Sequence, residues 1–135
     1  MRHSFNFLTA ATFVLLFGGC SQPTTPVTPT VQVANGMAIT LNTAPAPPHT
    51  GDDILIVTLM DATSQSPIGN ANIRATPIMQ SPRMRGTDVS GRAQGNGRYE
   101  IPVRFAIATR YEISLHIERT GKPPTDVTFP LEAQQ

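Results

Sequence analysis

The stretch 95-GNGRYEIPVRF-105 alternates polar and apolar side chains directly after a short glycine turn. Successive side chains of an extended strand point to opposite faces, so this alternation places all the apolar residues on one face. Those residues are Tyr99, Ile101, Val103 and Phe105. The pattern is typical of a strand in an antiparallel sheet that packs one face against a core and leaves the other in water.

The stretch 110-RYEISLHIER-119 repeats the same alternation a few residues later. Its inward set is Tyr111, Ile113, Leu115 and Ile117, and its outward set is Glu112, Ser114, His116 and Glu118. We expect the inward residues of both stretches to be buried together between two sheets, because neither stretch has a second apolar face.

Working outward, four further segments have strand character. Asn35-Gly36 separates two alternating runs in 31-VQVANGMAITL-41, which predicts a hairpin. Residues 54-ILIVTLM-60 are almost entirely apolar and predict a central strand, and a turn at 67–70 precedes an alternating run from Ala71. Residues 125-TDVTFPLE-132 close the set. The sequence therefore predicts an all-β, immunoglobulin-like antiparallel sandwich of about seven strands over residues 35–135.

The N-terminus has the layout of an export signal. Arg2 and His3 precede a short apolar run, and Gly18-Gly19-Cys20 resembles a bacterial lipobox, in which the cysteine sulfur carries diacylglycerol. The alternative is an ordinary secretory signal with a chance cysteine. We expect a lipoprotein signal peptide over 1–19 and a mature chain anchored by acylated Cys20 to the cell membrane or outer membrane, with its domain facing the periplasm or the cell exterior.

Between Cys20 and the domain, the sequence predicts a flexible tether over residues 20–34. The run 21-SQPTTPVTPT-30 alternates proline with threonine and carries no charge. Such a run forms neither a helix nor a central strand, and it extends about 3.1 Å per residue in a polyproline-like conformation.

The composition argues against several classes of function. Cys20 is the only cysteine, so the mature domain has no thiol for a disulfide, a metal or catalysis. Without Arg2 the chain has nine basic and nine acidic residues, which gives no electrostatic reason to expect nucleic acid as a partner. The mature chain has two histidines, too few to indicate a nucleophile–base arrangement, and we expect no enzymatic activity.

Several short motifs, in their order and spacing, resemble the YtkA-like domain family, which is related to FixH-like proteins. The match covers roughly residues 37–118. Its residues are Pro67, Gly69, Ala71 and Ile73 in a turn and strand, Met79, Pro82 and Met84 in a Met-Pro loop, and Gly95, Gly97 and Tyr99 in a glycine-led strand. A fourth element departs from the family pattern, since Ile107, Thr109 and Tyr111 stand where Met, Gly and Trp would be expected. The resemblance implies an immunoglobulin-like fold and an association with copper handling and cytochrome oxidase assembly.

Met79 and Met84 leave two alternatives open. Thioethers are soft ligands that suit Cu(I), so the pair could bind copper with a third donor from His116, His49 or Met37. Alternatively, both side chains fill the open end of the sandwich, and then no cofactor is expected. Arg83 and Arg85 argue against a cation site, because guanidinium groups repel a bound cation.

The remaining candidates have weaker patterns. His116 shares a face with Glu112 and Glu118, which fits either a weak metal patch or a solvated polar face. Asp52-Asp53 begins a strand and fits a turn or edge better than a catalytic pair. The favoured function is a lipid-anchored, non-catalytic envelope module that contacts the membrane through Cys20 and another envelope protein through its loops or edges. The alternative is a periplasmic Cu(I)-binding or copper-delivery protein that uses the Met-rich loop.

Overall fold

The computed structural model describes residues 30–135, and their regular structure is strand throughout. The predicted signal peptide (1–19), Cys20 and tether residues 21–29 lie outside the described residues. No helix in residues 30–135 is long and apolar enough to cross a membrane. The strands are β1 (Thr30–Ala34), β2 (Met37–Ala44), β3 (Gly51–Asp61), β4 (Ala71–Gln80), β5 (Arg83–Arg85), β6 (Val89–Ser90), β7 (Arg92–Gly95), β8 (Arg98–Phe105), β9 (Arg110–Arg119) and β10 (Thr125–Glu132).

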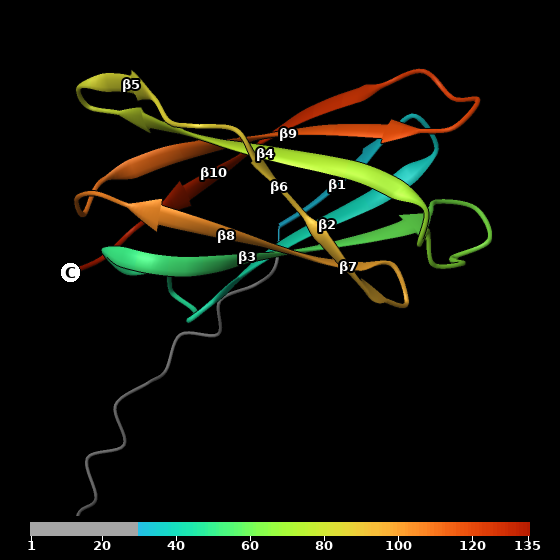
Figure 1. Ribbon diagram of the computed structural model, residues 1–135, viewed down its shortest axis with the longest axis horizontal. Coiled ribbons are helices and arrows are strands. Elements are labelled where there is room, and N and C mark those ends of the chain that lie inside the picture. Colours follow the sequence, from blue (N-terminus) through green and yellow to red (C-terminus); the bar gives the residue numbers. More distant parts are fainter. Residues whose placement is uncertain (1–29) are drawn as a thin grey trace, which may run out of the picture.

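The strands form two antiparallel sheets that pack face to face (Figure 1). The first sheet has the order β1-β2-β3-β8-β7, and the second has the order β10-β9-β4-β5, with β6 pairing with β4. Within this arrangement β2-β3-β8-β7 and β10-β9-β4 follow the strand order of an immunoglobulin constant-type sandwich. The all-β antiparallel sandwich is confirmed.

A tyrosine at the start of β9, in the second sheet, supports the immunoglobulin-like arrangement. Tyr111 lies at the start of β9, and its hydroxyl donates to the carbonyl of Ile107 at 3.0 Å and accepts from the Ile107 N–H at 3.3 Å. A tyrosine near the start of this strand that bonds to backbone a few residues upstream is the tyrosine corner of such domains. Tyr111 also packs on Phe105, with ring centroids 4.8 Å apart.

The inner faces of the two sheets make one core, as the alternation predicts. All the inward residues of β8 and β9 are buried, and Ile101, Ile113 and Leu115 have no exposed area. Strands β2, β3, β4 and β10 contribute Ile39, Leu55, Val57, Leu59, Ile73 and Phe129 to the core. β3 lies between β2 and β8, so the prediction of a central strand there is also confirmed.

The predicted boundary between tether and domain requires a correction. Residues 30–34, assigned to the tether from sequence, form β1 and pair with β2 through the Asn35-Gly36 turn. Both turn residues have positive φ, as a two-residue hairpin requires. The side chain of Gln32 donates to the Thr128 carbonyl at 2.6 Å, which joins β1 to β10 across the side of the sandwich. Because this backbone is paired on the β2 side, it belongs to the sheet.

Residues 83–95 contain three short strands that the alternation does not reveal. β5 and β6 pair with β4 in the second sheet, whereas β7 pairs with β8 in the first, so the chain crosses between the sheets here. These strands have two to four residues and are mostly exposed. They are therefore too short to show an alternation of apolar and polar residues in the sequence. The seven other strands have five or more residues and account for the expected number.

The glycine-led motif and the Pro67 turn meet at one end of the sandwich. Gly97 has φ of +73°, and a Cβ there would lie 2.3 Å from the Leu59 carbonyl oxygen. The Tyr99 hydroxyl donates to the Ile68 carbonyl at 2.8 Å and accepts from the Ala71 N–H at 3.0 Å. These motif residues therefore join β8 of the first sheet to the entry of β4 in the second, which is a structural role.

Candidate functional site

Met79 and Met84 are direct partners in the hairpin formed by β4 and β5. Residues directly opposite each other in antiparallel strands project to the same face, with Cβ atoms about 4.5–5.5 Å apart. The two-residue loop between Gln80 and Arg83 fixes this register. The hairpin therefore places two thioether side chains next to each other at one end of the sandwich.

The two thioethers differ in exposure. Met79 continues the inner face of β4 and packs against the core while remaining half-buried. Met84 extends beyond the sandwich and is 58% exposed. A buried filler role fits Met79 but not Met84, since most of the Met84 side chain touches solvent.

The neighbouring arginines lie on the other face of the hairpin. Arg83 and Arg85 flank Met84 in sequence, so their side chains alternate away from it. Arg85 contacts Asp88 at 3.0 Å, and Arg83 lies 3.9 Å from Glu112. The Thr76 hydroxyl donates to Asp88 and, with the Arg85 guanidinium nearby, holds the pKa of that carboxyl below its usual value. The electrostatic objection to a cation beside Met84 is therefore weaker than the sequence suggests.

The structure does not bring His116 to the methionine pair. Tyr111 is the β9 residue opposite Met79, and His116 lies five positions further along, on the outer face. At about 3.3 Å per residue the separation along the strand is about 17 Å. His116 therefore cannot complete a site at the hairpin.

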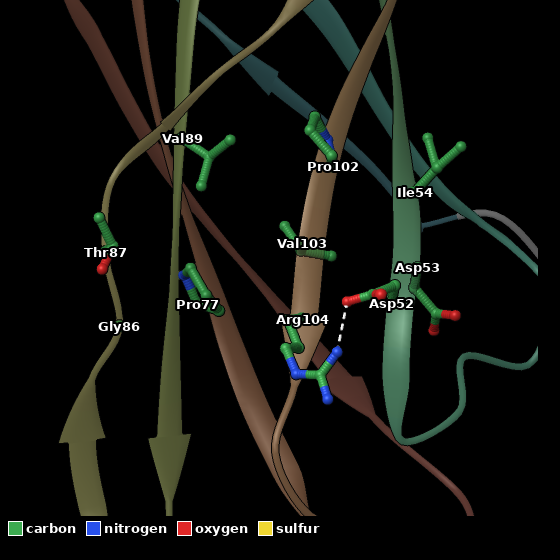
Figure 2. Close-up of a pocket in the computed structure, with 10 residues that line it drawn as sticks. All are labelled: Asp52, Asp53, Ile54, Pro77, Gly86, Thr87, Val89, Pro102, Val103 and Arg104. Carbon is green, nitrogen blue, oxygen red and sulfur yellow. Dashed lines mark hydrogen bonds and ion pairs between the residues drawn. The ribbon is translucent and has the colours of Figure 1, made fainter.

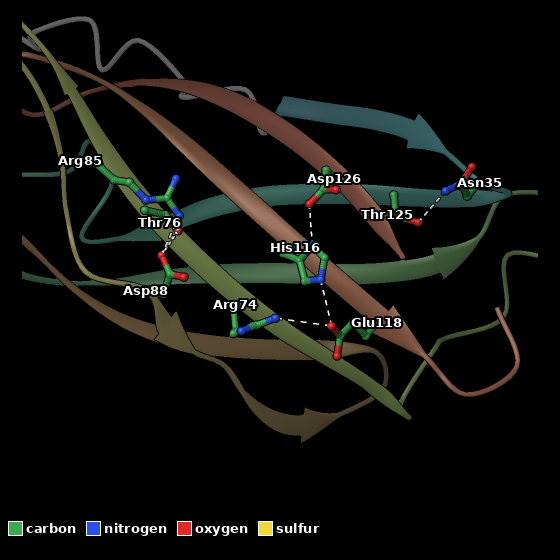
Figure 3. Close-up of polar contacts among 9 residues, drawn as sticks. All are labelled: Asn35, Arg74, Thr76, Arg85, Asp88, His116, Glu118, Thr125 and Asp126. Carbon is green, nitrogen blue, oxygen red and sulfur yellow. Dashed lines mark hydrogen bonds and ion pairs between the residues drawn. The ribbon is translucent and has the colours of Figure 1, made fainter. Parts of the chain in front are cut away.

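Both imidazole nitrogens of His116 are already paired (Figure 3). Nδ1 lies 2.6 Å from Asp126 and Nε2 lies 3.0 Å from Glu118, which in turn contacts Arg74 at 3.4 Å. The hydrogen bond to Asp126, followed by that to Glu118, raises the pKa of His116 above its usual value. An imidazole whose two nitrogens are both paired with carboxylates has no free nitrogen to offer a metal. Among residues 30–135 no group of three or more His, Cys, Asp or Glu side chains could hold a metal ion.

The two other candidate donors also lie apart from the hairpin. Met37 is 1% exposed and begins β2 opposite Asp61, inside the core. His49 lies in the β2–β3 loop, where its N–H donates to Asp53 Oδ2 at 2.8 Å and its own backbone bridges to Gln134. Within the described residues, Met79 and Met84 are therefore the donors that the fold brings together.

A groove of about 580 Å³ opens beside the hairpin, between β8 and the segment that crosses between the sheets (Figure 2). Its walls are mainly apolar, with Pro77, Val89, Pro102 and Val103, and the exposed Asp52–Arg104 ion pair of 2.7 Å lies at its rim. β7 covers β8 only as far as Glu100, so among residues 30–135 no strand pairs with that side of the part of β8 that lines the groove.

Asp52 and Asp53 cannot act together at this groove. They are neighbours on β3, so their side chains project to opposite faces, and Figure 2 shows Asp52 directed to Arg104 and Asp53 directed away. Asp53 is 5% exposed and accepts the His49 N–H. Both carboxylates hold neighbouring parts of the chain in place.

Sequence analysis missed the direct pairing of the two methionines and the hydroxyl contacts of Tyr99 and Tyr111. The pairing had a signal: a short loop at 81–82 between Gln80 and Arg83 puts Met79 opposite Met84 if the loop is a hairpin. The Tyr99 contacts had none, because Ile68 and Ala71 reach Tyr99 only when the two sheets pack, whereas Tyr111 bonds to Ile107 only four residues upstream.

Comparison with known proteins identifies the fold alone. No family model matches the sequence, and no curated protein is similar to it in sequence. A DUF4426 family protein of Pseudomonas aeruginosa PAO1 has a similar structure, with a TM-score of 0.58 and 12% identity over 78% of this chain and 96% of that one. FetP of uropathogenic Escherichia coli strain F11 is similar in a copper-bound variant, with a TM-score of 0.59 and 13% identity over 78% of this chain and 95% of that one. The as-isolated form of FetP, expressed in the periplasm, has a TM-score of 0.59 and 13% identity over 79% of this chain and 95% of that one.

Proposed function

We propose that the protein is a lipid-anchored, non-catalytic binding module of the cell envelope, and that Cu(I) is its ligand at the β4–β5 hairpin. The observation that carries the proposal is the direct pairing of Met79 with the exposed Met84. Two adjacent thioethers supply two soft donors, and soft donors select Cu(I) over harder ions.

Four further observations support this function. The arginines beside Met84 project to the other face and contact acidic residues. The copper-bound FetP variant shares the fold, and an export signal would deliver the chain to the compartment where exported copper proteins work. The motif resemblance to YtkA-like proteins also supports copper handling, because that family is associated with it.

A copper titration tests the proposal. The reduced protein should bind about one Cu(I) per chain in competition with a chromogenic Cu(I) chelator, and the double variant Met79→Leu/Met84→Leu should not. Leucine keeps most of the apolar volume, so the variant should fold normally. Met60→Leu is the matched control, because Met60 lies on the outer face of β3, away from the hairpin. Wild-type protein that fails to compete, or a double variant that competes equally, would contradict a copper function.

The pH dependence of copper binding provides a second test. A thioether has no proton to lose, so a site made of two methionines should hold Cu(I) equally from about pH 5 to about pH 8. A site that included histidine would weaken toward the acidic end of that range. Marked acid sensitivity of binding would therefore refute a thioether-only site.

The anchor has its own test. Cys20→Ser should remove the acylation site and leave a form that stays unprocessed or soluble, whereas the wild-type chain should partition into detergent. Processing and membrane attachment of Cys20→Ser like the wild type would refute the lipoprotein assignment while leaving copper binding unaffected.

The second candidate is an accessory module that binds another envelope protein without metal. The apolar groove and the uncovered edge of β8 favour it, since an extended peptide can pair with such an edge. A photo-crosslinker at Thr87, inside the groove, should then give a discrete adduct in cells. The same group at Glu118, on the outer face of β9, should not.

A further inference from the structure

Apart from Asp52 at the start of β3, the outward residues of β1, β2 and β3 carry no charge, and we call the surface that they form the uncharged face. Cross-strand pairing places them side by side in rows, such as Val31 beside Thr40 and Thr58, and Val33 beside Ala38 and Met60. Its members are Val31, Val33, Ala38, Thr40, Asn42, Ile54, Ile56, Thr58 and Met60.

Several large apolar side chains on this face are open to solvent. Val33 is 69% exposed, Val31 is 55% exposed and Ile54 is 39% exposed. The outer face of an antiparallel sandwich normally carries polar residues, because it meets water. Val31 and Val33 are successive outward residues of β1, and neighbouring apolar side chains exposed on such a face are a feature of interaction sites.

The chain enters the domain at the edge of this face. Thr30 is the first residue of β1, so Val31, the first outward residue, follows immediately. Residues 21–29 separate Cys20 from Thr30, and these ten steps along the chain span about 31 Å at about 3.1 Å per residue. An anchor at Cys20 would thus hold the most exposed valines closer to the lipid than a long linker would.

The rim of the face is compatible with lipid headgroups. Arg92 of β7 and Arg98 and Arg104 of β8 project to the same side as the uncharged face, together with the acids Glu100 of β8 and Asp52 of β3. Arg98 pairs with Glu100 at 2.9 Å and Arg104 pairs with Asp52 at 2.7 Å, so the excess is one positive charge, which suits an anionic membrane surface.

The opposite side of the molecule is unsuited to that contact. The outward residues of β4, β5, β9 and β10 include nine charged or titratable side chains, namely Arg74, Arg83, Arg85, Arg110, Glu112, His116, Glu118, Asp126 and Glu132. Covering them would remove water from charged groups, which is costly.

We propose that the uncharged face rests on the headgroup layer of the membrane to which the chain is anchored, so that the charged outer face of the second sheet points to solvent. This inference rests on the proposed anchor at Cys20 and does not depend on copper binding. The hairpin with Met84 lies at the end of the sandwich, and it stays accessible in this orientation.

Depth-dependent fluorescence quenching tests the orientation. Cys20 is the only native cysteine and would be acylated, so Val33→Cys and Thr128→Cys each offer one thiol for a fluorophore, on opposite faces. The lipidated protein is reconstituted into phosphatidylcholine–phosphatidylglycerol vesicles that contain a spin-labelled lipid. We expect quenching at position 33 to exceed that at position 128 by about threefold or more, as for a surface that contacts the headgroup region.

Each other result overturns the inference for a distinct reason. Equal quenching at both positions would mean that the domain has no preferred orientation. Self-quenching of the label at position 33 without quenching by lipid would mean that a second copy covers the face. Protein that does not float with the vesicles would refute the anchor itself, which separates that failure from a wrong orientation.

A variant confirms which side chains make the contact. With the label at Thr40→Cys on the same face, the double change Val31→Asp/Val33→Asp should reduce quenching to the level seen at position 128. Both valines are exposed, so the variant should retain its fold, which circular dichroism would verify. Unchanged quenching would overturn the inference.

Discussion

The outer faces of the two sheets differ, although their inner faces make one core. On the second sheet opposite charges lie directly across from each other, as in Arg110 beside Glu132 and Asp126 beside His116. On the first sheet the rows across β1, β2 and β3 hold valine, alanine, threonine and methionine, and opposite charges lie across from each other only toward β8, as in Asp52 beside Arg104. The two inner faces make the core, so the contrast between the outer faces is the basis of the membrane contact proposed for the first sheet.

The largest effect expected is on the shared inner face. Leu115 is fully buried, so Leu115→Ala should lower the free energy of unfolding by about 2–4 kcal/mol through lost apolar transfer and a cavity. Glu112→Ala, on the outer face of the same strand, should change it by no more than about 0.5 kcal/mol. The reverse order in urea melts would mean that the inner and outer faces are exchanged.

A second effect concerns the bond that joins the sheets. Tyr99→Phe removes a buried hydroxyl and leaves the Ile68 carbonyl and Ala71 N–H without it, which should cost about 1–3 kcal/mol. Tyr111→Phe, whose hydroxyl bonds only within one loop, should cost about 1 kcal/mol in the same urea melts. Equal small losses would show that the contact between sheets adds nothing to stability.

The charged outer face should make stability depend on pH. Because the folded-state pKa of His116 is raised, its contribution is fully present below its unfolded value of about 6.5 and is lost as pH rises through the folded pKa. Between about pH 6.5 and the folded-state pKa of His116, the free energy of unfolding of the wild-type protein should therefore fall relative to that of His116→Gln. Parallel pH profiles of the two proteins in denaturant melts would refute the effect.

The smallest effect is expected on the uncharged face. Val33→Thr should change the free energy of unfolding in solution by no more than about 0.5 kcal/mol, because the side chain is exposed in the isolated domain. A larger loss in the anchor-free protein would mean that Val33 supports the fold, and the contrast between the outer faces would lose its functional meaning.

The core and the sheet class follow from sequence because alternation is a local property of each strand. The inward residues of β8 and β9 were identifiable from spacing alone, and Asn35-Gly36 marked the first hairpin. Gly97 was also visible as a motif, but its close approach to Leu59 depends on tertiary packing.

The candidate site was less predictable because it depends on which strands become neighbours. The candidate residues Met79 and Met84 were identified from sequence, and their direct opposition required the hairpin register. His116 was expected to share a face with Glu112 and Glu118, as it does, but its partner Asp126 comes from the neighbouring strand β10. The uncharged face could not be predicted from sequence, because it is defined by the pairing register of β1, β2 and β3 together.

The position of Thr30 has a mechanical consequence. Thr30 begins β1 at an edge of the first sheet and lines a groove together with Pro130 and Gln134. A pull on the chain at Thr30 would load β1 from its own first residue, so its pairs with β2 would open one after another toward the Asn35-Gly36 turn. β1 contributes no fully buried side chain, so tension from a moving membrane could peel this strand away while the core between the sheets stays closed. The first strand would then yield under load and extend the reach of the link, without unfolding of the domain.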